Sequence, residues 1–279
     1  MNKDKLTSFC HKISKETGLP FNSIMHYYFL ESILQCIAKS DFKENFIFKG
    51  GFLLSNVVGI KSRSTTDMDF LLDNMKLSEE KIQIMLNEVL KRNEDKGISY
   101  KIQDIKPIKG EDSYGGLRVS IICKLENIRQ TVPIDIATGD IVTPNSIDYK
   151  YISLFGNEDI IIKAYPIESM IAEKIQTIYS KGFLNSRSKD YYDLYILYQL
   201  RKDKINQQTL IKACGKTFQS RETEFDLLKI RELLEKLKID ESFIKRWRSY
   251  AKKNVYVQGI SFEDVIGNAL KLLDVIKTK

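Results

Sequence analysis

FIFKGGFLLSNVVGIKSRSTTDMDFLLD, residues 46–73, is the stretch of this 279-residue chain that decides its fold. Its apolar beginning predicts a short buried strand that ends at the paired glycines Gly50 and Gly51. FLLSNVV then predicts a short helix that stops at Gly59. After a polar loop, DMDFLLD (67–73) predicts a second strand, and this strand begins with two acidic residues, Asp67 and Asp69.

The two acidic residues, Asp67 and Asp69, stand two positions apart on that strand. Because side chains alternate along a strand, both point to the same side. Adjacent like charges are tolerated when a divalent cation lies between them, and Mg²⁺ (or Mn²⁺ in its place) prefers carboxylates together with substrate phosphates. The pair therefore predicts metal ligands that act on a nucleoside triphosphate. The alternative is an acidic strand end that faces water.

Groups next to these carboxylates are suited to binding phosphate. Gly50 and Gly51 expose bare backbone N–H groups at the start of a helix, an arrangement that holds triphosphate oxygens. A plain tight turn is the alternative. In the following loop, Arg63 either pairs with a phosphate or stays a solvated charge. Thr65 and Thr66 either donate to phosphate or cap the loop.

A third carboxylate is expected on a neighbouring strand. Asp135 interrupts the apolar run VPIDIA, where a charge is costly unless it is paired or bound to a metal. A solvent-facing position in the strand alternation is its other interpretation. Asp140 is the weaker choice for a third ligand, because it lies in a predicted turn.

The predicted elements change in type near residue 160. Before this point, helices alternate with β-branched segments; helices are expected at 22–39 and 77–97, and strands at 98–108, 116–126 and 131–140. After it, only helices are predicted, at 166–181, 189–201, 206–219, 222–238, 240–253 and 261–277. We therefore predict an α+β fold in two domains, 1–160 with a mixed sheet and 161–279 with helices only. The two are expected to pack closely around an active-site cleft.

Composition and charge restrict the class of protein. The four cysteines lie far apart and the chain has only two histidines, which argues against a zinc site and fits a reducing compartment. We find neither a signal peptide nor an apolar run of roughly 20 residues, so a cytoplasmic protein without a membrane span is expected. Residues 161–279 hold 23 Lys and Arg against 15 Asp and Glu. This excess predicts an anionic partner such as nucleic acid, or else only solvated helix faces.

A lysine interrupts the apolar stripe of the predicted helix 166–181. At 100° per residue, Lys174 falls in the middle of that stripe, where its ammonium must reach solvent, pair with a carboxylate or contact an anionic ligand. The next predicted helix carries Asp190 on its packing face with Asp193 beside it. We expect these groups to converge on the cleft, with Lys174 binding triphosphate and an aspartate acting as base or nucleotide contact. Asp190 can instead complement the helix dipole.

These sequence blocks resemble a known family. KGGFLL followed by RSTTDMDF is similar to the GG…Rx[ST]xDxD[FL] signature of AbiEii/AbiGii-type nucleotidyltransferase toxins. ESMIAEK followed by RSKDYYDLY is similar to their downstream ExxxAEK…[RK]DxxDL signature. Together the two blocks cover much of residues 46–200. The departures are Phe52, where a threonine is common, and Lys189, where an arginine usually stands.

The resemblance implies a polymerase-β-like nucleotidyltransferase core in residues 1–160, with N-terminal helices, followed by a helical C-terminal domain. It also implies roles for individual residues. The family's positions for a hydroxyl, two metal carboxylates, a lysine and a later aspartate with its neighbour fall on Thr65, Asp67, Asp69, Lys174, Asp190 and Asp193.

The function that the resemblance implies is that of a toxin from a bacterial toxin–antitoxin or abortive-infection system for phage defence, restrained by a cognate antitoxin. Such an enzyme transfers a nucleoside monophosphate from a triphosphate, GTP or a pyrimidine triphosphate, to RNA, with the tRNA acceptor end as the expected target. The C-terminal part carries a basic segment, KRWRSYAKK (245–253). In it, Trp247 and Tyr250 are available to stack on a base, or the segment is a solvated helix face.

Two rival functions are weighed beside this one. A small-molecule nucleotidyltransferase of the antibiotic-modifying kind shares the same chemistry, although the basic excess of the second half argues against it. A non-catalytic nucleic-acid-binding protein on a transferase scaffold is the other. The intact aspartate pair and Lys174 argue against that reading.

Overall fold

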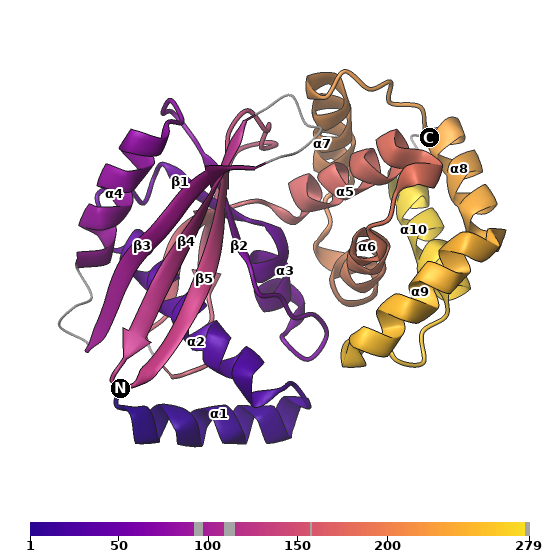
Figure 1. Ribbon diagram of the computed structural model, residues 1–279. Coiled ribbons are helices and arrows are strands. Elements are labelled where there is room, and N and C mark those ends of the chain that lie inside the picture. The colour runs from indigo at the N-terminus through magenta and orange to yellow at the C-terminus, as the bar shows by residue number, and fades with distance from the viewer. Residues whose placement is uncertain (92–96, 109–114, 157, 277–279) are drawn as a thin grey trace. The chain divides into compact units, whose positions relative to one another are not determined.

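The structure is a computed structural model, shown in Figure 1, and it describes residues 1–91, 97–108, 115–156 and 158–276. The chain divides into two compact units, each of which is described by itself. The first unit consists of Met1–Asp140 and Ser146–Ala164, and the second of Ile141–Asn145 and Tyr165–Lys279.

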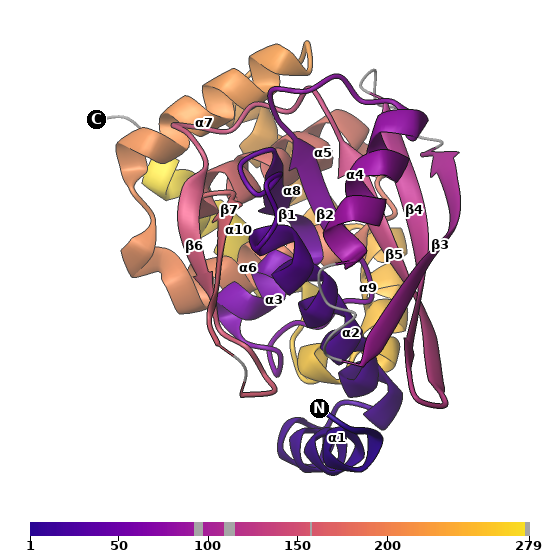
Figure 2. The ribbon, with the colours of Figure 1, turned by 90° about the vertical axis from the view of Figure 1, so that its left-hand side faces the viewer.

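The first unit contains, within its described residues, a seven-stranded mixed sheet. Its strands are β1 (Phe46–Lys49), β2 (Met68–Leu72), β3 (Ile98–Pro107), β4 (Gly116–Leu125), β5 (Ile128–Ala137), β6 (Ile147–Tyr151) and β7 (Ile160–Ala164). They stand in the order β3-β4-β5-β2-β1-β7-β6. β2 pairs antiparallel with β1 and parallel with β5, so the acidic strand lies at the centre of the sheet (Figure 2).

The predicted strands of the first half are confirmed, and the structure adds β6 and β7 to them. β5 begins earlier than predicted, at Ile128, because a tight turn at Glu126, whose φ is 52°, lets the β4–β5 pairing continue to Leu125 and Ile128. β6 was missed because most of its side chains are exposed, so it shows no apolar alternation.

Four helices accompany this sheet in the described part of the first unit: α1 (Lys3–Thr17), α2 (Phe21–Ala38), α3 (Gly50–Val58) and α4 (Glu79–Lys91). α2 is buried along most of its length and contacts β5, β7 and α4. α4 begins at Glu79, two residues after the predicted start, and the Ser78 hydroxyl accepts from the Lys81 amide at 3.4 Å. Its predicted end at residue 97 depends on residues outside the described ranges.

Glu31 is a buried acid that ties α2 to the segment after β6. Its carboxylate accepts hydrogen bonds from the Ser153 hydroxyl at 2.6 Å, the Leu154 amide at 2.8 Å and the Tyr151 hydroxyl at 3.0 Å. Burial raises the pKa of the Glu31 carboxyl to about 7, in spite of these three donors.

The free energy of unfolding is therefore expected to fall as pH rises from 4.5 to about 7. In this range the unfolded chain has released the Glu31 proton and the folded chain keeps it, so the unfolded state binds fewer protons. The decrease amounts to about 3 kcal/mol and ends above the folded-state pKa. Urea unfolding of Glu31→Gln across this range should lack the decrease, because an amide does not titrate. Glu16→Gln, at an exposed position of α1, should retain it; equal slopes in both variants would contradict the prediction.

The regular elements in the described part of the second unit are all helices. Its α-helices are α5 (Ile167–Lys181), α6 (Ser188–Arg201), α7 (Gln207–Ser220), α8 (Leu227–Ile239), α9 (Glu241–Lys253) and α10 (Phe262–Ile276). Short 3₁₀ turns follow α5, α6 and α9: η2 (Gly182–Leu184), η3 (Lys202–Lys204) and η4 (Val255–Val257). α10 packs against α6 and α8, and most of its side chains are buried.

The predicted helices of the second half are confirmed, and side-chain caps explain the starts of α7, α8 and α9. Asn206 caps α7 and Asp240 caps α9, each accepting from backbone amides of the first turn. α8 begins at Leu227 rather than at residue 222, because Asp226 is its cap and accepts from the next amides. The predicted α+β fold class is thus confirmed. None of the described helices is long and apolar enough to cross a membrane.

Candidate functional site

The paired glycines lie directly against the central acidic strand; they form the first turn of α3, which begins at Gly50 rather than at Phe52 as predicted, and we call them the glycine turn. Lys49 and Asp69 are paired residues in the β1–β2 register. Gly50 follows with φ of 72°, and a Cβ atom built there would lie 1.9 Å from a carboxylate oxygen of Asp69. A side chain at this position is therefore excluded both by the backbone conformation and by the carboxylate. The glycine turn thus fits closely against the Asp69 carboxylate. A plain tight turn would not need such a contact with the neighbouring strand.

The second glycine brings the predicted loop residues to the same place. The Gly51 amide donates to the Asp69 carboxylate at 3.3 Å. A Cβ atom on Gly51 would lie 2.9 Å from the Thr65 hydroxyl and 3.7 Å from the Arg63 guanidinium. The Thr65 hydroxyl in turn donates to Asp67. Arg63 is buried, so it is not the solvated loop charge that was one of its two interpretations.

Helix α2 holds this loop in position. The Tyr27 hydroxyl accepts from the Thr65 amide at 2.9 Å. His26 contacts the Thr66 carbonyl through Nε2 at 2.7 Å and the Gln130 side chain through Nδ1 at 2.9 Å. Sequence reasoning missed both α2 residues, because nothing in the local pattern of this apolar helix marks them as loop supports.

The two candidates for a third carboxylate have different partners. Asp135 pairs with Asp69 in the β2–β5 register, and its carboxylate binds both Nε and Nη2 of Arg118, at 2.7 and 2.6 Å. Asp140 forms an ion pair with Lys49 at 2.5 Å, with both side chains largely shielded. Asp135 is thus the acid next to Asp69, whereas Asp140 neutralises the lysine that precedes the glycine turn.

Arg118 is a cation of this site that sequence reasoning missed. Its hydrogen bonds to Asp135 raise the pKa of the guanidinium above its ordinary value, and the charges of Asp67 and Asp69 add to this effect. The signal that would have found it is the hairpin register. Pairing Leu125 with Ile128 around the tight turn places Arg118 opposite Asp135.

The described residues offer few ligands to a metal ion. Among the residues that the structure describes, no three His, Cys, Asp or Glu side chains are grouped so that they could hold a metal. Asp67 and Asp69 remain as a carboxylate pair beside the glycine turn. Mg²⁺ is commonly held by one or two carboxylates together with substrate phosphates. The pair fits an ion that arrives with its nucleotide, and Asp135 as a metal ligand stays a prediction.

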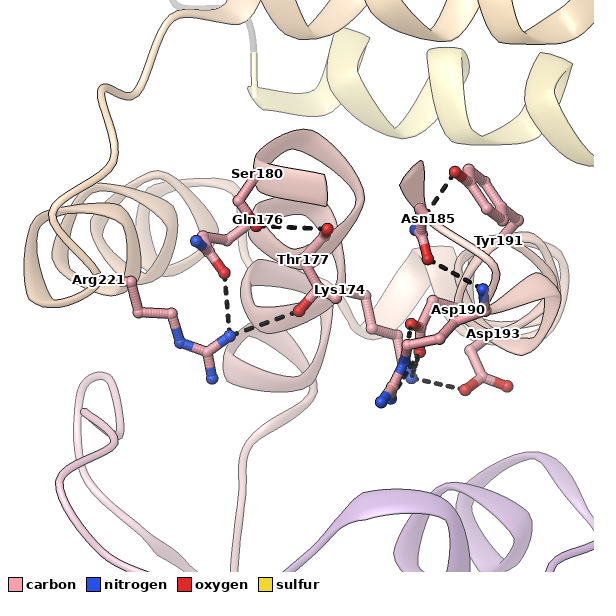
Figure 3. A network of polar contacts seen from close by, with 10 residues as sticks. Lys174, Gln176, Thr177, Ser180, Asn185, Asp190, Tyr191, Asp193 and Arg221 are labelled. Carbon is pink, nitrogen blue, oxygen red and sulfur yellow. Dashed lines mark hydrogen bonds and ion pairs between the residues drawn. The ribbon is translucent and has the colours of Figure 1, made fainter. Parts of the chain in front are cut away.

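In the second unit, the structure brings the predicted lysine and aspartates together (Figure 3). Lys174 of α5 contacts Asp193 at 2.5 Å and Asp190 at 3.4 Å, both on α6. Arg187 adds a second cation, with its Nε 2.6 Å from Asp190. Burial by itself would raise the pKa of Asp190, but the charges of Lys174 and Arg187 outweigh it and hold that pKa below the ordinary value. Lys174 thus pairs with carboxylates, one of the three roles predicted for it.

The other side of α5 carries a separate polar group, also seen in Figure 3. Arg221 donates to the Gln176 side chain at 2.9 Å and to the Thr177 hydroxyl at 3.4 Å. Gln176 also donates to Thr223 at 3.0 Å. These contacts join α5 to the end of α7 and do not involve Lys174, so we assign them a structural role.

The prediction that Trp247 can stack on a base is wrong. Its side chain is only 3% exposed, and it packs against the rings of Tyr192 and Phe262. The indole N–H donates to the Ile260 carbonyl at 2.9 Å. Trp247 is a core residue, whose burial was not evident from the charged segment around it. Tyr250, by contrast, is half-buried.

Substitution of Gly50 tests the close approach between the turn and Asp69. We expect Gly50→Ala to abolish most nucleotidyl transfer, because the new methyl group would have to displace the Asp69 carboxylate. Gly59→Ala is the matched control, since Gly59 also has positive φ, 91°, but has no atom within 4 Å of the added Cβ. It should cost stability of about 1–3 kcal/mol through backbone strain and leave transfer intact. Equal activity of the two variants would contradict this reading.

A sheet with paired glycines against a strand that bears an Asp-x-Asp pair is the arrangement that the sequence resemblance to nucleotidyltransferases led us to expect. The chain matches the AbiEii nucleotidyl transferase toxin of type IV toxin–antitoxin systems over residues 32–268, and it belongs to that family. This confirms the resemblance seen in the two sequence blocks. Among curated proteins, none matches the chain.

Two solved structures from Helicobacter pylori resemble this fold. One is described as a candidate nucleotidyltransferase; it is 16% identical, with a TM-score of 0.58 over 92% of this chain and 96% of its own. The other, JHP933, is also 16% identical, with a TM-score of 0.56 over 92% and 93% of the two chains. At this identity the likeness concerns the fold alone.

Proposed function

We propose that this chain transfers a nucleoside monophosphate from a nucleoside triphosphate to the end of an RNA, with the acceptor end of tRNA as the target. The observation that carries the proposal is the approach of Gly50 to Asp69, which leaves no room for a side chain between the turn and the carboxylate. Family membership supports the nucleotidyl transfer itself. The basic excess of the second half supports a polyanionic acceptor over a small molecule.

Residues of the first unit are assigned as follows. Asp67 and Asp69 would hold a divalent cation with the triphosphate; the Gly50 amide faces its phosphates, and the Gly51 amide donates to Asp69. Mg²⁺ or Mn²⁺ bound there would activate the attacking hydroxyl and neutralise charge on the departing pyrophosphate. Thr65 orients Asp67 through its hydroxyl, and Arg63 contacts a phosphate from its buried position beside Gly51.

The transfer forms one bond and breaks one. A terminal hydroxyl oxygen of the RNA bonds to the α-phosphorus, the bond from that phosphorus to the bridging oxygen breaks, and pyrophosphate leaves. The hydroxyl proton must pass to a base or to water. Asp135 is next to Asp69 and assists as a third carboxylate, while Arg118 fixes its orientation by two hydrogen bonds.

In the second unit we assign Lys174 as a phosphate contact and Asp190 as a positioning residue. Asp190 is buried, held by Lys174 and Arg187, and its lowered pKa disfavours proton uptake. These contacts support a role in holding Lys174 rather than the role of a base. Asp193, 2.5 Å from the lysine ammonium, acts in the same way or contacts the nucleotide.

The setting we propose is a type IV toxin–antitoxin pair that acts in phage defence, with a cognate antitoxin opposing the toxin. We place it in the cytoplasm, where nucleoside triphosphates and RNA are both present. All four cysteines are free and buried, which is consistent with a reducing compartment. GTP and the pyrimidine triphosphates are the proposed donors.

The test is incubation of the full chain with Mg²⁺ and each of the four α-labelled nucleoside triphosphates, with total tRNA or with small hydroxyl-bearing antibiotics as acceptors. We expect label in the tRNA with one or more of the triphosphates. We expect no labelling of tRNA whose 3′-hydroxyl has been oxidised and blocked beforehand. Label found in the small acceptors alone would support the antibiotic-modifying function. No transfer to any acceptor would refute the proposal.

A further inference from the structure

A groove on the second unit, which we call the α6–α9 groove, carries cations and hydroxyls. It has a volume of about 710 Å³ and lies between the start of α6 and one face of α9. Its described lining holds five cationic side chains, five hydroxyls and no carboxylate. The lining residues are Ser186, Arg187, Ser188, Lys189, Ser242, Lys245, Arg246, Ser249, Tyr250 and Lys253.

Several of these cations are not engaged by acidic residues of the chain. Lys189, Lys245 and Lys253 form no salt bridge with any carboxylate in the described ranges, and Lys245 and Lys253 are exposed. Arg246 lies with its guanidinium 3.9 Å from the Phe243 ring centre and donates to the Ser242 hydroxyl at 3.2 Å. The ring and the hydroxyl orient this cation, and the charge of Asp240 acts on it as well, so the unneutralised charge of the groove is that of the three lysines. A concentration of unneutralised positive charge attracts a polyanion.

The mixture of groups favours a sugar–phosphate backbone over an acidic protein surface. Arg and Lys together with Ser and Tyr hydroxyls are the side chains that contact phosphate oxygens in nucleic-acid complexes. Arg187 belongs both to the groove and to the cluster of Asp190 and Lys174, so the groove adjoins the residues assigned to phosphate contact within the same unit. A backbone lying in the groove would therefore run next to that cluster.

We infer that the α6–α9 groove binds the phosphate backbone of the RNA acceptor. This inference rests on the proposed function for its choice of ligand, and it adds the surface on which that ligand is held. Phosphates contact Lys189, Lys245 and Lys253, with Arg246 and the serine hydroxyls between them. Contact with backbone rather than bases implies binding that depends strongly on salt and weakly on sequence.

The test is binding of 3′-labelled tRNA to the full chain, measured by fluorescence anisotropy. The salt concentration is varied from about 50 to 200 mM, a range over which the affinity of a phosphate-binding protein falls steeply. Lys245→Glu/Lys253→Glu should weaken binding about tenfold or more and reduce the slope of log K against log salt by about 2. The control is Lys236→Glu/Lys252→Glu, which makes the same charge change at exposed lysines of α8 and α9 that do not line the groove. It should change affinity less than about threefold.

Failure of this inference is distinguishable from failure of the proposed function. Equal losses in the groove and control variants, or no loss in either, would overturn the groove as the binding surface. Binding of poly-glutamate in place of tRNA would overturn RNA as the ligand and assign the groove to an acidic protein. If the wild-type chain binds tRNA through the groove but transfers no label, the groove stands and the proposed acceptor reaction fails.

Discussion

Asp69→Asn is expected to reduce nucleotidyl transfer by on the order of 10²–10³-fold, the scale seen when a group that stabilises transition-state charge is removed. The pairing of Asp69 with Lys49 in the sheet fixes the backbone of Asp69. The Gly51 amide, which donates to the carboxylate at 3.3 Å, fixes its side chain. An amide in its place keeps the shape and still accepts from Gly51. It removes the negative charge that holds a divalent cation. The loss should therefore appear in turnover rather than in folding.

The control for this substitution is Asp73→Asn, which changes the same residue type at an exposed position just after β2. It should leave transfer within about twofold of wild type, as surface substitutions usually do. The midpoint temperature of thermal unfolding of Asp69→Asn should equal that of the wild type or lie slightly above it. The substitution relieves the repulsion from Asp67, which favours the folded state. Full transfer activity, or full toxicity in growing cells, with Asp69→Asn would refute the catalytic assignment.

The central part of the first unit was predictable because its signals are local. A strand, two glycines and a helix start are read from neighbouring residues, and the period of two puts Asp67 and Asp69 on one side. The Lys174 prediction succeeded for the same reason. A charge in an apolar helical stripe needs a partner, and the two aspartates on and beside the packing face of the next helix were candidates for that role.

The features that were not predicted depend on the register of paired strands and on contacts between segments far apart in the sequence. The ion pair of Lys49 with Asp140 joins residues 91 positions apart, and no local pattern connects them. Arg118 becomes a partner of Asp135 only once the β4–β5 register is fixed. The burial of Trp247 likewise follows from the packing of α9 on α6 and α10, although its segment is the most basic in the chain.

Lys174→Met is expected to destabilise the second unit by about 3–5 kcal/mol, the cost of leaving a buried charge without its partner. The side chains of Asp190 and Asp193 are only 2% and 1% exposed, and the lysine ammonium contacts both. Arg187 continues to neutralise Asp190 in the variant, so the charge that loses its contacting ammonium is mainly that of Asp193. Urea unfolding followed by Trp247 fluorescence measures this loss, because Trp247 is the one tryptophan of the chain and is buried in the second unit.

The double variant Lys174→Met/Asp193→Asn separates the structural role of the lysine from its proposed role with phosphate. Removing both charges should recover most of the stability, because a neutral buried pair of similar size costs little. Lys216→Met, at an exposed lysine of α7, is the control and should unfold like wild type. If Lys174 contacts the triphosphate, the double variant will be stable yet still deficient in transfer. Recovery of both stability and transfer in the double variant would limit Lys174 to neutralising Asp193. Wild-type stability of the single variant Lys174→Met would show that the folded state does not need the Lys174 ammonium beside Asp193.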